Sequence, residues 1–145
     1  MYAPLQILSA YSLLKNPNTI EQIIQVAKER HYEAVALTDI NVMYGAVDFY
    51  QTARKYGIKP LFGLTLLING LVNTATTFPV LLIAENQAGY QNLMWISSAK
   101  MTSKSSDMTL TVIADHLDGI NVILSQDSEL AQFIAAEYDD ATDYW

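Results

Sequence analysis

The stretch Ala34-Val35-Ala36-Leu37-Thr38-Asp39-Ile40-Asn41 decides the fold, because a continuous apolar run leads directly into polar residues. A short apolar run of this kind is typical of a strand buried on both faces, as in a sheet covered by helices. The polar residues then follow the carboxyl end of that strand. The pattern predicts an α/β protein with a buried strand over 34–37.

Helical patterns flank this strand. Before it, apolar residues recur at helical spacing, and a helix is predicted from residue 20 to about residue 31: Ile20, Ile23, Ile24 and Ala27. Asn18, followed three residues later by Glu21, predicts a capping box at its start. After the strand, a second helix is predicted over 45–56, and Gly57 is placed to take the left-handed position that ends it.

Further out, strands and helices continue to alternate. Additional strands are expected at 4–8, 60–68, 78–84 and 120–124, helices at 86–98, 111–117 and 125–137, a loop or hairpin at 69–77, and a polar linker at 101–108. Alternation of this kind indicates repeated βαβ units and a mostly parallel sheet, either open and doubly wound or closed into a barrel.

Composition excludes several classes of protein. Lys and Arg number 8 and Asp and Glu 15, giving a net charge of −7, which argues against binding of nucleic acid by this chain alone. The absence of cysteine excludes disulfides and Cys-ligated zinc. Neither a membrane span nor a signal peptide is evident, so we expect a cytoplasmic protein. Residues 137–145 are acidic and end in Tyr144-Trp145, which we interpret as a tail cut from a following segment.

The carboxyl ends of the predicted strands are where an α/β active site would lie, and they offer three carboxylates: Asp39, Glu85 and Asp127. Asp39 has two interpretations, an Asx cap on the following turn or a relic of a site. Glu85 is expected to cap a helix, and Asp127 or Ser128 is expected to cap the last one.

No other pattern indicates catalysis or ligand binding. His31 and His116 lie near predicted helix ends, and His116 is expected to be exposed. No glycine-rich phosphate loop is present. Tyr90 and Trp95 are interpreted as core and rim residues, since no basic residues are interleaved with them.

Several motifs occur in an order that resembles the N-terminal polymerase-and-histidinol-phosphatase (PHP) domain of bacterial DNA polymerase III alpha subunits, of the DnaE type and in its Gram-positive form. The resemblance covers residues 3–98 strongly and 110–135 more loosely. The motifs are SAYSLL at 9–14, ALTD at 36–39, YGAVDFY at 44–50, GIKPLFG at 57–63, PVLLIA at 79–84, GYQNLM at 89–94 and ISS at 96–98.

The resemblance implies a distorted seven-stranded β/α barrel, of which residues 1–145 would form the N-terminal part. Metal-binding members hold up to three ions at the strand ends. Their His-x-His-x-His-Ser motif reads Pro4-Leu5-Gln6-Ile7-Leu8-Ser9 here, which puts Gln6 and Leu8 at ligand positions. Thr-Asp-His-Gly reads Thr38-Asp39-Ile40-Asn41, and Gly-x-Glu reads Gly63-Leu64-Thr65. Ile40 and Thr65 thus replace two further ligands, and leucine and isoleucine cannot bind a metal.

We therefore expect a degenerate domain without catalytic, cofactor or metal-binding residues, and with Asp39 as a candidate relic. By resemblance, the parent polymerase would use Mg²⁺ in a separate palm domain, and DNA and deoxynucleotides would bind only there. Expected partners are the rest of the polymerase chain and other replisome subunits, with a homodimer through an open sheet edge. The alternatives are a residual metal-dependent phosphoesterase or 3′–5′ proofreading nuclease that uses Asp39, and a free-standing interaction module.

Overall fold

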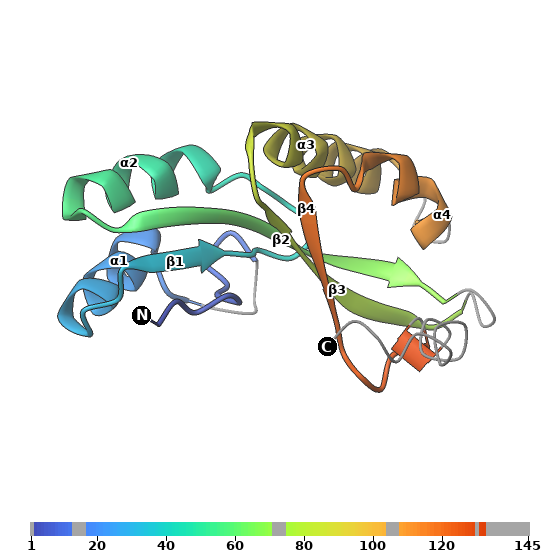
Figure 1. The fold of residues 1–145 in the computed structure, drawn as a ribbon, viewed down its shortest axis with the longest axis horizontal. Coiled ribbons are helices and arrows are strands. Elements are labelled where there is room, and N and C mark those ends of the chain that lie inside the picture. The colour runs from blue at the N-terminus through green and yellow to red at the C-terminus, as the bar shows by residue number, and fades with distance from the viewer. Residues whose placement is uncertain (1, 13–16, 71–74, 104–107, 130, 133–145) are drawn as a thin grey trace, which may run out of the picture.

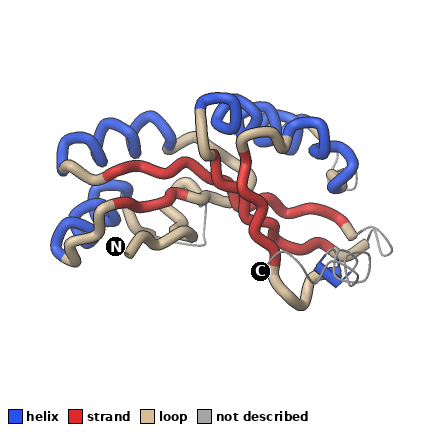
Figure 2. Tube along the Cα trace, viewed as in Figure 1, coloured by secondary structure: helices blue, strands red, loops and turns tan. Residues whose placement is uncertain are grey.

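The computed structural model describes residues 2–12, 17–70, 75–103, 108–129 and 131–132 (Figure 1). The helices are α1 (Ile20–Glu29), α2 (Ala46–Tyr56), α3 (Gln87–Thr102), α4 (Leu110–Ile113) and the 3₁₀ turn η1 (Ala114–His116). The strands are β1 (Ala34–Leu37), β2 (Lys59–Asn69), β3 (Thr77–Ala84) and β4 (Ile120–Leu124). This mixture of helices and strands confirms the predicted α/β class (Figure 2).

The sheet is mixed, so the prediction of a mostly parallel sheet was wrong. Its order is β1-β2-β3-β4, and β1 pairs with β2 in parallel whereas β2 with β3, and β3 with β4, pair in antiparallel fashion. The short return between β2 and β3 permits only antiparallel pairing. The hairpin that was one of the two options for 69–77 is thus present. The described strands form a four-stranded sheet, and the seven-stranded barrel that the resemblance implies stays a prediction.

Residues 4–8 were predicted as the first strand, but they form no strand and instead hydrogen-bond to β1 and Thr38. The amide of Ala36 donates to the carbonyl oxygen of Pro4 over 3.0 Å, and the amide of Thr38 donates to Ile7 over 2.8 Å. The Ile7 amide donates instead to the Thr38 side chain, Oγ1, over 3.1 Å. A side-chain acceptor thus replaces a backbone partner, which interrupts the ladder next to β1.

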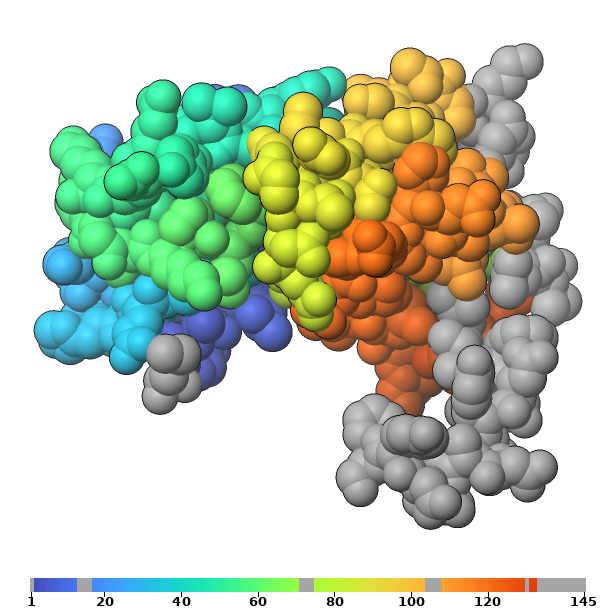
Figure 3. All heavy atoms as spheres, turned by 45° about the horizontal axis from the view of Figure 1, so that its top comes forward, coloured from blue at the N-terminus to red at the C-terminus, as the bar shows by residue number. Residues whose placement is uncertain are grey.

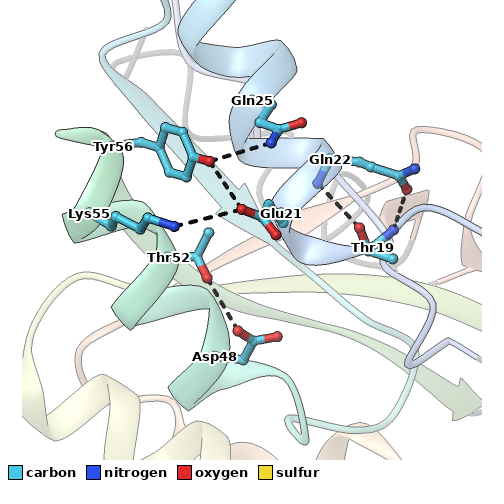
Figure 4. Close-up of polar contacts among 8 residues, drawn as sticks. All are labelled: Thr19, Glu21, Gln22, Gln25, Asp48, Thr52, Lys55 and Tyr56. Carbon is cyan, nitrogen blue, oxygen red and sulfur yellow. Dashed lines mark hydrogen bonds and ion pairs between the residues drawn. The ribbon is translucent and has the colours of Figure 1, made fainter.

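The capping box of α1 lies one residue later than predicted. Thr19, not Asn18, is the N-cap: its hydroxyl accepts from the Gln22 amide over 3.2 Å, and the Gln22 side chain accepts from the Thr19 amide over 2.9 Å (Figure 4). Gln22 thus takes the place that glutamate often occupies in a capping box, with its side-chain oxygen accepting from the N-cap amide. The predicted apolar stripe of α1 is buried as expected.

Polar side chains join α1 to α2 on the surface (Figure 4). The Tyr56 hydroxyl donates to Glu21 Oε1 over 3.0 Å and accepts from Gln25 over 3.4 Å. Lys55 Nζ lies 3.8 Å from the same Glu21 oxygen. Both members of this ion pair are largely exposed, so it adds little to stability.

The two helices that precede the parallel strands end alike. Gly57 after α2 has a φ of 72°, as predicted, and His31 after α1 has a φ of 56°. In each case the amide of the left-handed residue donates to the carbonyl oxygen of the residue three positions before it. The amide of the following residue donates to the carbonyl oxygen of the residue five positions before that following residue. This is the Schellman arrangement, and His31 therefore holds a position that favours glycine.

Two apolar clusters form the core. One combines α1, β1 and α2 around Phe49, with Phe62 of β2 packed against it. The other combines the second half of β2 with β3 and α3 around Leu64 and Leu93, and it also includes Ile113 of α4. The strand β2 thus contributes to both clusters.

Close backbone contact joins α3 to the segment before β4. A Cβ on Gly89 would overlap the carbonyl group of Gly119, whose own φ is 69°. The Glu85 amide donates to that carbonyl over 2.9 Å. Glycine at position 89 therefore lets the two segments meet directly.

The remaining predicted elements are partly visible. The linker predicted over 101–108 begins as the last turn of α3, and its residues 104–107 lie outside the described residues. Residues 130 and 133–137 of the helix predicted at 125–137, and the tail at 137–145, also lie outside them. Within the part of the chain that is described, no helix is long and apolar enough to cross a membrane.

Candidate functional site: a serine-bound carboxylate at the strand ends

Asp39 lies at the carboxyl end of β1 and is only 2% exposed. Its Oδ1 accepts from the Ser9 amide over 2.6 Å and from the Ser12 hydroxyl over 2.6 Å. Its Oδ2 accepts from the Ser9 hydroxyl over 2.7 Å. A buried carboxylate requires such donors, and both oxygens of Asp39 have them.

Each of the two serine hydroxyls also accepts a hydrogen bond. Ser9 Oγ accepts from the Tyr11 amide over 3.2 Å, and Ser12 Oγ accepts from the Ile40 amide over 2.9 Å. Ser9 and Ser12 are themselves buried. The set of Ser9, Ser12 and Asp39, hereafter the serine–aspartate cluster, therefore fastens residues 9–12 to the end of β1.

The predicted Asx cap of Asp39 on the turn that follows it is not what the structure shows. The partners of its side chain lie 27 and 30 residues earlier in the chain. Sequence reasoning considered Ser9 only as the residue after an expected strand and missed both serines as partners of Asp39. A usable signal was present, since Ser9, Ser12 and Asp39 all lie in the two motifs that precede and follow the first helix.

Asn41 and Thr65 complete the strand end. Asn41 has a φ of 59°, a conformation that asparagine tolerates better than most residues. Its amide donates to the Thr65 carbonyl over 2.9 Å, and its side chain accepts from the Leu67 amide over 2.9 Å. The Thr65 hydroxyl donates to the Thr38 carbonyl over 2.7 Å. These contacts join the carboxyl end of β1 to the middle of β2.

The positions that would hold metal in the resembled family carry glutamine, leucine, isoleucine and threonine here. Gln6 is exposed, and Leu8 and Ile40 are half-buried. Ile40 lines a mostly apolar cavity of about 590 Å³. The residues around this cavity are Ala10, Tyr11, Ser12, Ile40, Val42, Tyr44 and Met101.

A metal ion therefore does not fit the residues present. Asp39 already accepts three hydrogen bonds, and the Thr65 hydroxyl donates to a carbonyl. Nowhere in the described ranges do three or more His, Cys, Asp or Glu residues gather as a metal site would need. We derive no reaction step through a metal at this site.

The other strand-end carboxylates, Glu85 and Asp127, are exposed, whereas Asp39 is buried. Glu85 is exposed and precedes α3, whose N-cap is Asn86, with its side chain accepting from the Gly89 amide over 3.0 Å. Ser128, and not Asp127, accepts from the Ala131 amide over 3.1 Å. The cap predicted for Glu85 was wrong, and of the two candidates at 127–128 the serine is the cap.

Neither histidine belongs to the serine–aspartate cluster, and His116 is not the exposed residue that we expected. Its ring is half-buried and stacks on Trp95, with ring centroids 3.5 Å apart and an angle of 14° between the planes. Its Nδ1 lies 3.4 Å from Asn92 Oδ1. Trp95 is itself 43% exposed, as expected for a rim residue, and Tyr90 makes an edge contact with Phe62.

Comparison with known proteins places this arrangement in a family. The model of the PHP domain family matches residues 4–145. The chain belongs to the PHP domain family. This confirms the resemblance seen in the sequence, and the serine–aspartate cluster lies at the strand ends of a PHP domain.

Curated relatives of this PHP chain include DNA polymerase III alpha subunits. That of Bacillus subtilis (strain 168) is 34% identical over 122 residues, which are 84% of this chain and 11% of that protein. That of Staphylococcus aureus (strain Mu50) is 28% identical over 143 residues, or 99% of this chain and 13% of that protein. That of Helicobacter pylori (strain 26695) is 38% identical over 102 residues, or 67% and 8%. The PHP chain therefore spans 8 to 13% of the length of these relatives.

A solved structure shares the fold. An amidohydrolase from Chromobacterium violaceum aligns with a TM-score of 0.52 at 17% identity, over 81% of this chain and 49% of that one. The structural alignment supports the α/β architecture. Because the sequence identity is this low, the alignment carries no conclusion about the reaction.

Proposed function

We propose that this chain is the N-terminal part of the PHP domain of a DNA polymerase III alpha subunit and serves DNA replication as a structural domain of that polymerase. The similarity to alpha subunits over most of the chain supports this assignment. In that setting the partners are the rest of the polymerase chain and other replisome subunits, in the cytoplasm.

The observation that supports a structural role is the hydrogen bonding of the Asp39 carboxylate. Asp39, which lies next to one of the replaced ligand positions, uses both carboxylate oxygens to hold residues 9–12 in place. Gln6, Leu8, Ile40 and Thr65 stand where the family's metal ligands would be. We infer that the domain neither hydrolyses phosphoesters nor proofreads as a 3′–5′ nuclease.

Nucleotide addition by the proposed parent would take place elsewhere. DNA polymerases commonly use two metal ions to stabilise the attacking and leaving oxygens, and we assign Mg²⁺, DNA and deoxynucleotides to a palm domain outside these residues. The net charge of −7 agrees with this division of labour, because phosphate binding requires clustered cations.

Metal content tests the structural role. The chain is dialysed against Mn²⁺ or Zn²⁺ and analysed by inductively coupled plasma mass spectrometry, with a nitrophenyl phosphate ester and a 3′-labelled primer as substrates. We expect neither stoichiometric metal nor hydrolysis. A variant that combines Leu8→His, Ile40→His and Thr65→Glu is the matched control, because it restores three family ligands and is expected to gain metal.

Two results would contradict the proposal. Two or more equivalents of bound metal together with nuclease activity in the unaltered chain would establish the phosphoesterase alternative. Primer extension by the 145-residue chain alone would contradict a purely structural role. The assignment to a polymerase is tested separately by sequencing the gene past the codon for Trp145, where a stop codon would favour a free-standing interaction module.

A further inference from the structure

The outer face of α3 is rich in apolar side chains. The inner side of this helix packs on the sheet as part of the second core cluster. On the opposite side Met94 is 49%, Trp95 43% and Met101 54% exposed, and Ser98 is exposed between them. Figure 3 shows α3, in yellow, at the surface of the molecule. Met94, Trp95, Ser98 and Met101 are hereafter the outer α3 face.

This side of α3 also lacks charge. Every exposed residue of α3 is uncharged, and the one charged residue of the helix, Lys100, is half-buried. The two preceding helices expose charged side chains instead: Glu21, Lys28 and Glu29 in α1, and Asp48, Arg54 and Lys55 in α2. Apolar residues on both sides of a helix are typical of a helix that is covered on both sides. The sequence of α3 therefore indicates that its outer face is covered in the assembled protein.

The spacing on the outer α3 face fits another helix. Met94, Ser98 and Met101 lie at helical positions i, i+4 and i+7, so they form one row along α3. Ser98 is small, and the side chains of a neighbouring helix can therefore pack between the two methionines. Methionine side chains adapt to such neighbours, and Trp95 adds aromatic surface beside the row. The element that fits this face is an apolar side of a second helix.

The size of the face indicates where that helix comes from. Met94 and Met101 are separated by about 10 Å along the helix. Free partners usually need an interface of about 1,200–2,000 Å² to form a stable complex. A segment of the same chain needs less contact area, because its attachment gives it a high effective concentration. A second copy is disfavoured further, because each copy has a net charge of −7. A tethered segment is thus the favoured occupant.

We propose that a helix from the polymerase chain beyond residue 145 packs on the outer α3 face. The inference rests on the proposed function, and it names one contact that this domain makes within the polymerase. The related alpha subunits have ample chain for such a helix, since the present chain spans only 8 to 13% of their length. Met101 also lines the apolar cavity of about 590 Å³ next to Ile40. The covering helix therefore lies beside the strand end that carries the serine–aspartate cluster.

Alkylation of an introduced thiol tests whether the face is covered. The chain has no cysteine, so Ser98→Cys gives it a single thiol at the centre of the outer α3 face. Val26→Cys, on α1 at a position that is 46% exposed, is the matched control. Iodoacetamide is expected to modify both variants of the 145-residue chain at similar rates, followed peptide by peptide in a mass spectrometer. In the full-length polymerase we expect Ser98→Cys to react at least about tenfold more slowly, because the thiol is reached only when the covering helix opens, and Val26→Cys to react at an unchanged rate.

A photo-crosslinker identifies what covers the face. Met94 is replaced by benzoylphenylalanine in the full-length polymerase, and the same replacement of Val26 is the control. On irradiation, the Met94 variant is expected to form crosslinks within one polymerase chain, to peptides beyond residue 145, and the Val26 variant is not. A crosslink from the Met94 variant to a second polymerase or to a separate subunit would overturn the proposal.

The failure of this inference is distinguishable from that of the proposed function. A gene that ends at the codon for Trp145 would contradict the proposed function and this inference together. In a gene that continues, equal reaction rates of Ser98→Cys in the short and the full-length chain would overturn this inference and leave the polymerase assignment intact. Equal slowing of Ser98→Cys and Val26→Cys would also overturn it, because α3 would then be no more covered than α1.

Discussion

The Ser12 hydroxyl donates to Asp39 Oδ1 over 2.6 Å and accepts from the amide of Ile40 over 2.9 Å, so that one hydroxyl joins two adjacent residues at the end of β1. Ser12 and Asp39 are both 2% exposed. A charge-assisted hydrogen bond in such a buried place is stronger than one on the surface, and its loss leaves a buried group without a partner.

Asp39→Asn is expected to lower the free energy of unfolding by about 2–3 kcal/mol, because an amide group would oppose three donors with fewer acceptor sites. Urea denaturation measures this. Asp48→Asn is the matched control, since Asp48 is exposed and accepts from Thr52 over 3.2 Å, and its cost should stay within about 0.5 kcal/mol. Equal losses in the two variants would contradict the importance of the serine–aspartate cluster.

His31→Gly is expected to raise the free energy of unfolding by about 1 kcal/mol, because His31 adopts a left-handed conformation that glycine reaches without strain. The reverse change at the equivalent position, Gly57→Ala, is expected to cost about 1 kcal/mol. A Cβ on Gly57 would meet nothing within 4 Å, so that cost is conformational. Thermal unfolding checks both, and a lower melting temperature for His31→Gly would refute the argument.

Gly89→Ala is expected to cost about 3 kcal/mol or more, because the added methyl group overlaps the carbonyl of Gly119 and the backbone must move. The loss should appear in urea unfolding and as faster hydrogen exchange of the β4 amides. Ala88→Gly, at the exposed neighbouring position in α3, is the control and should cost at most about 1 kcal/mol. A stable Gly89→Ala variant with protected β4 amides would show that the two segments can separate freely.

Lys100→Met is expected to raise the melting temperature at pH 7. Burial lowers the pKa of Lys100 from its usual value of 10.5, so the folded chain releases this proton at a lower pH than the unfolded chain does. The destabilisation by the charged form is therefore complete below the folded pKa and fades as the pH rises towards 10.5.

Melting temperatures between pH 7 and 10 test this dependence, with Lys28→Met at an exposed position of α1 as the control. The advantage of Lys100→Met over the unaltered chain should shrink as the pH rises. An advantage that stays constant over this range would assign the effect to packing and not to charge.

The elements that the sequence predicted well are those whose own residues contain the signal. The stripe of α1, the apolar run of β1 and the glycine that follows α2 each reflect a local rule. The direction of β3 and β4 has no such local signature, because alternation of strands and helices does not distinguish a crossover from a hairpin followed by an antiparallel return. The strand prediction for residues 4–8 was wrong for a similar reason. Thr38, which is 31 residues away from Ile7 in sequence, supplies the side chain that interrupts the pairing of this segment with β1.

The candidate site was predicted in location but not in its contacts. The rule that ligands bind at strand ends directed attention to Asp39. Its partners could not be found from spacing, since Ser9 and Ser12 come from a loop before α1, which only tertiary folding brings to β1. The stack of His116 on Trp95 was missed likewise, because it depends on how η1 folds back along α3.

The strand β2 supplies Phe62 to one core cluster and Leu64 to the other, with only Gly63 between them. A Cβ at Gly63 would overlap both the Thr38 side chain and the Leu82 carbonyl oxygen. The backbone is therefore closely packed where β2 passes from one core cluster to the other. Neither cluster can come apart without withdrawing a strand from the other. A change that displaces Gly63 would therefore disturb both clusters at once.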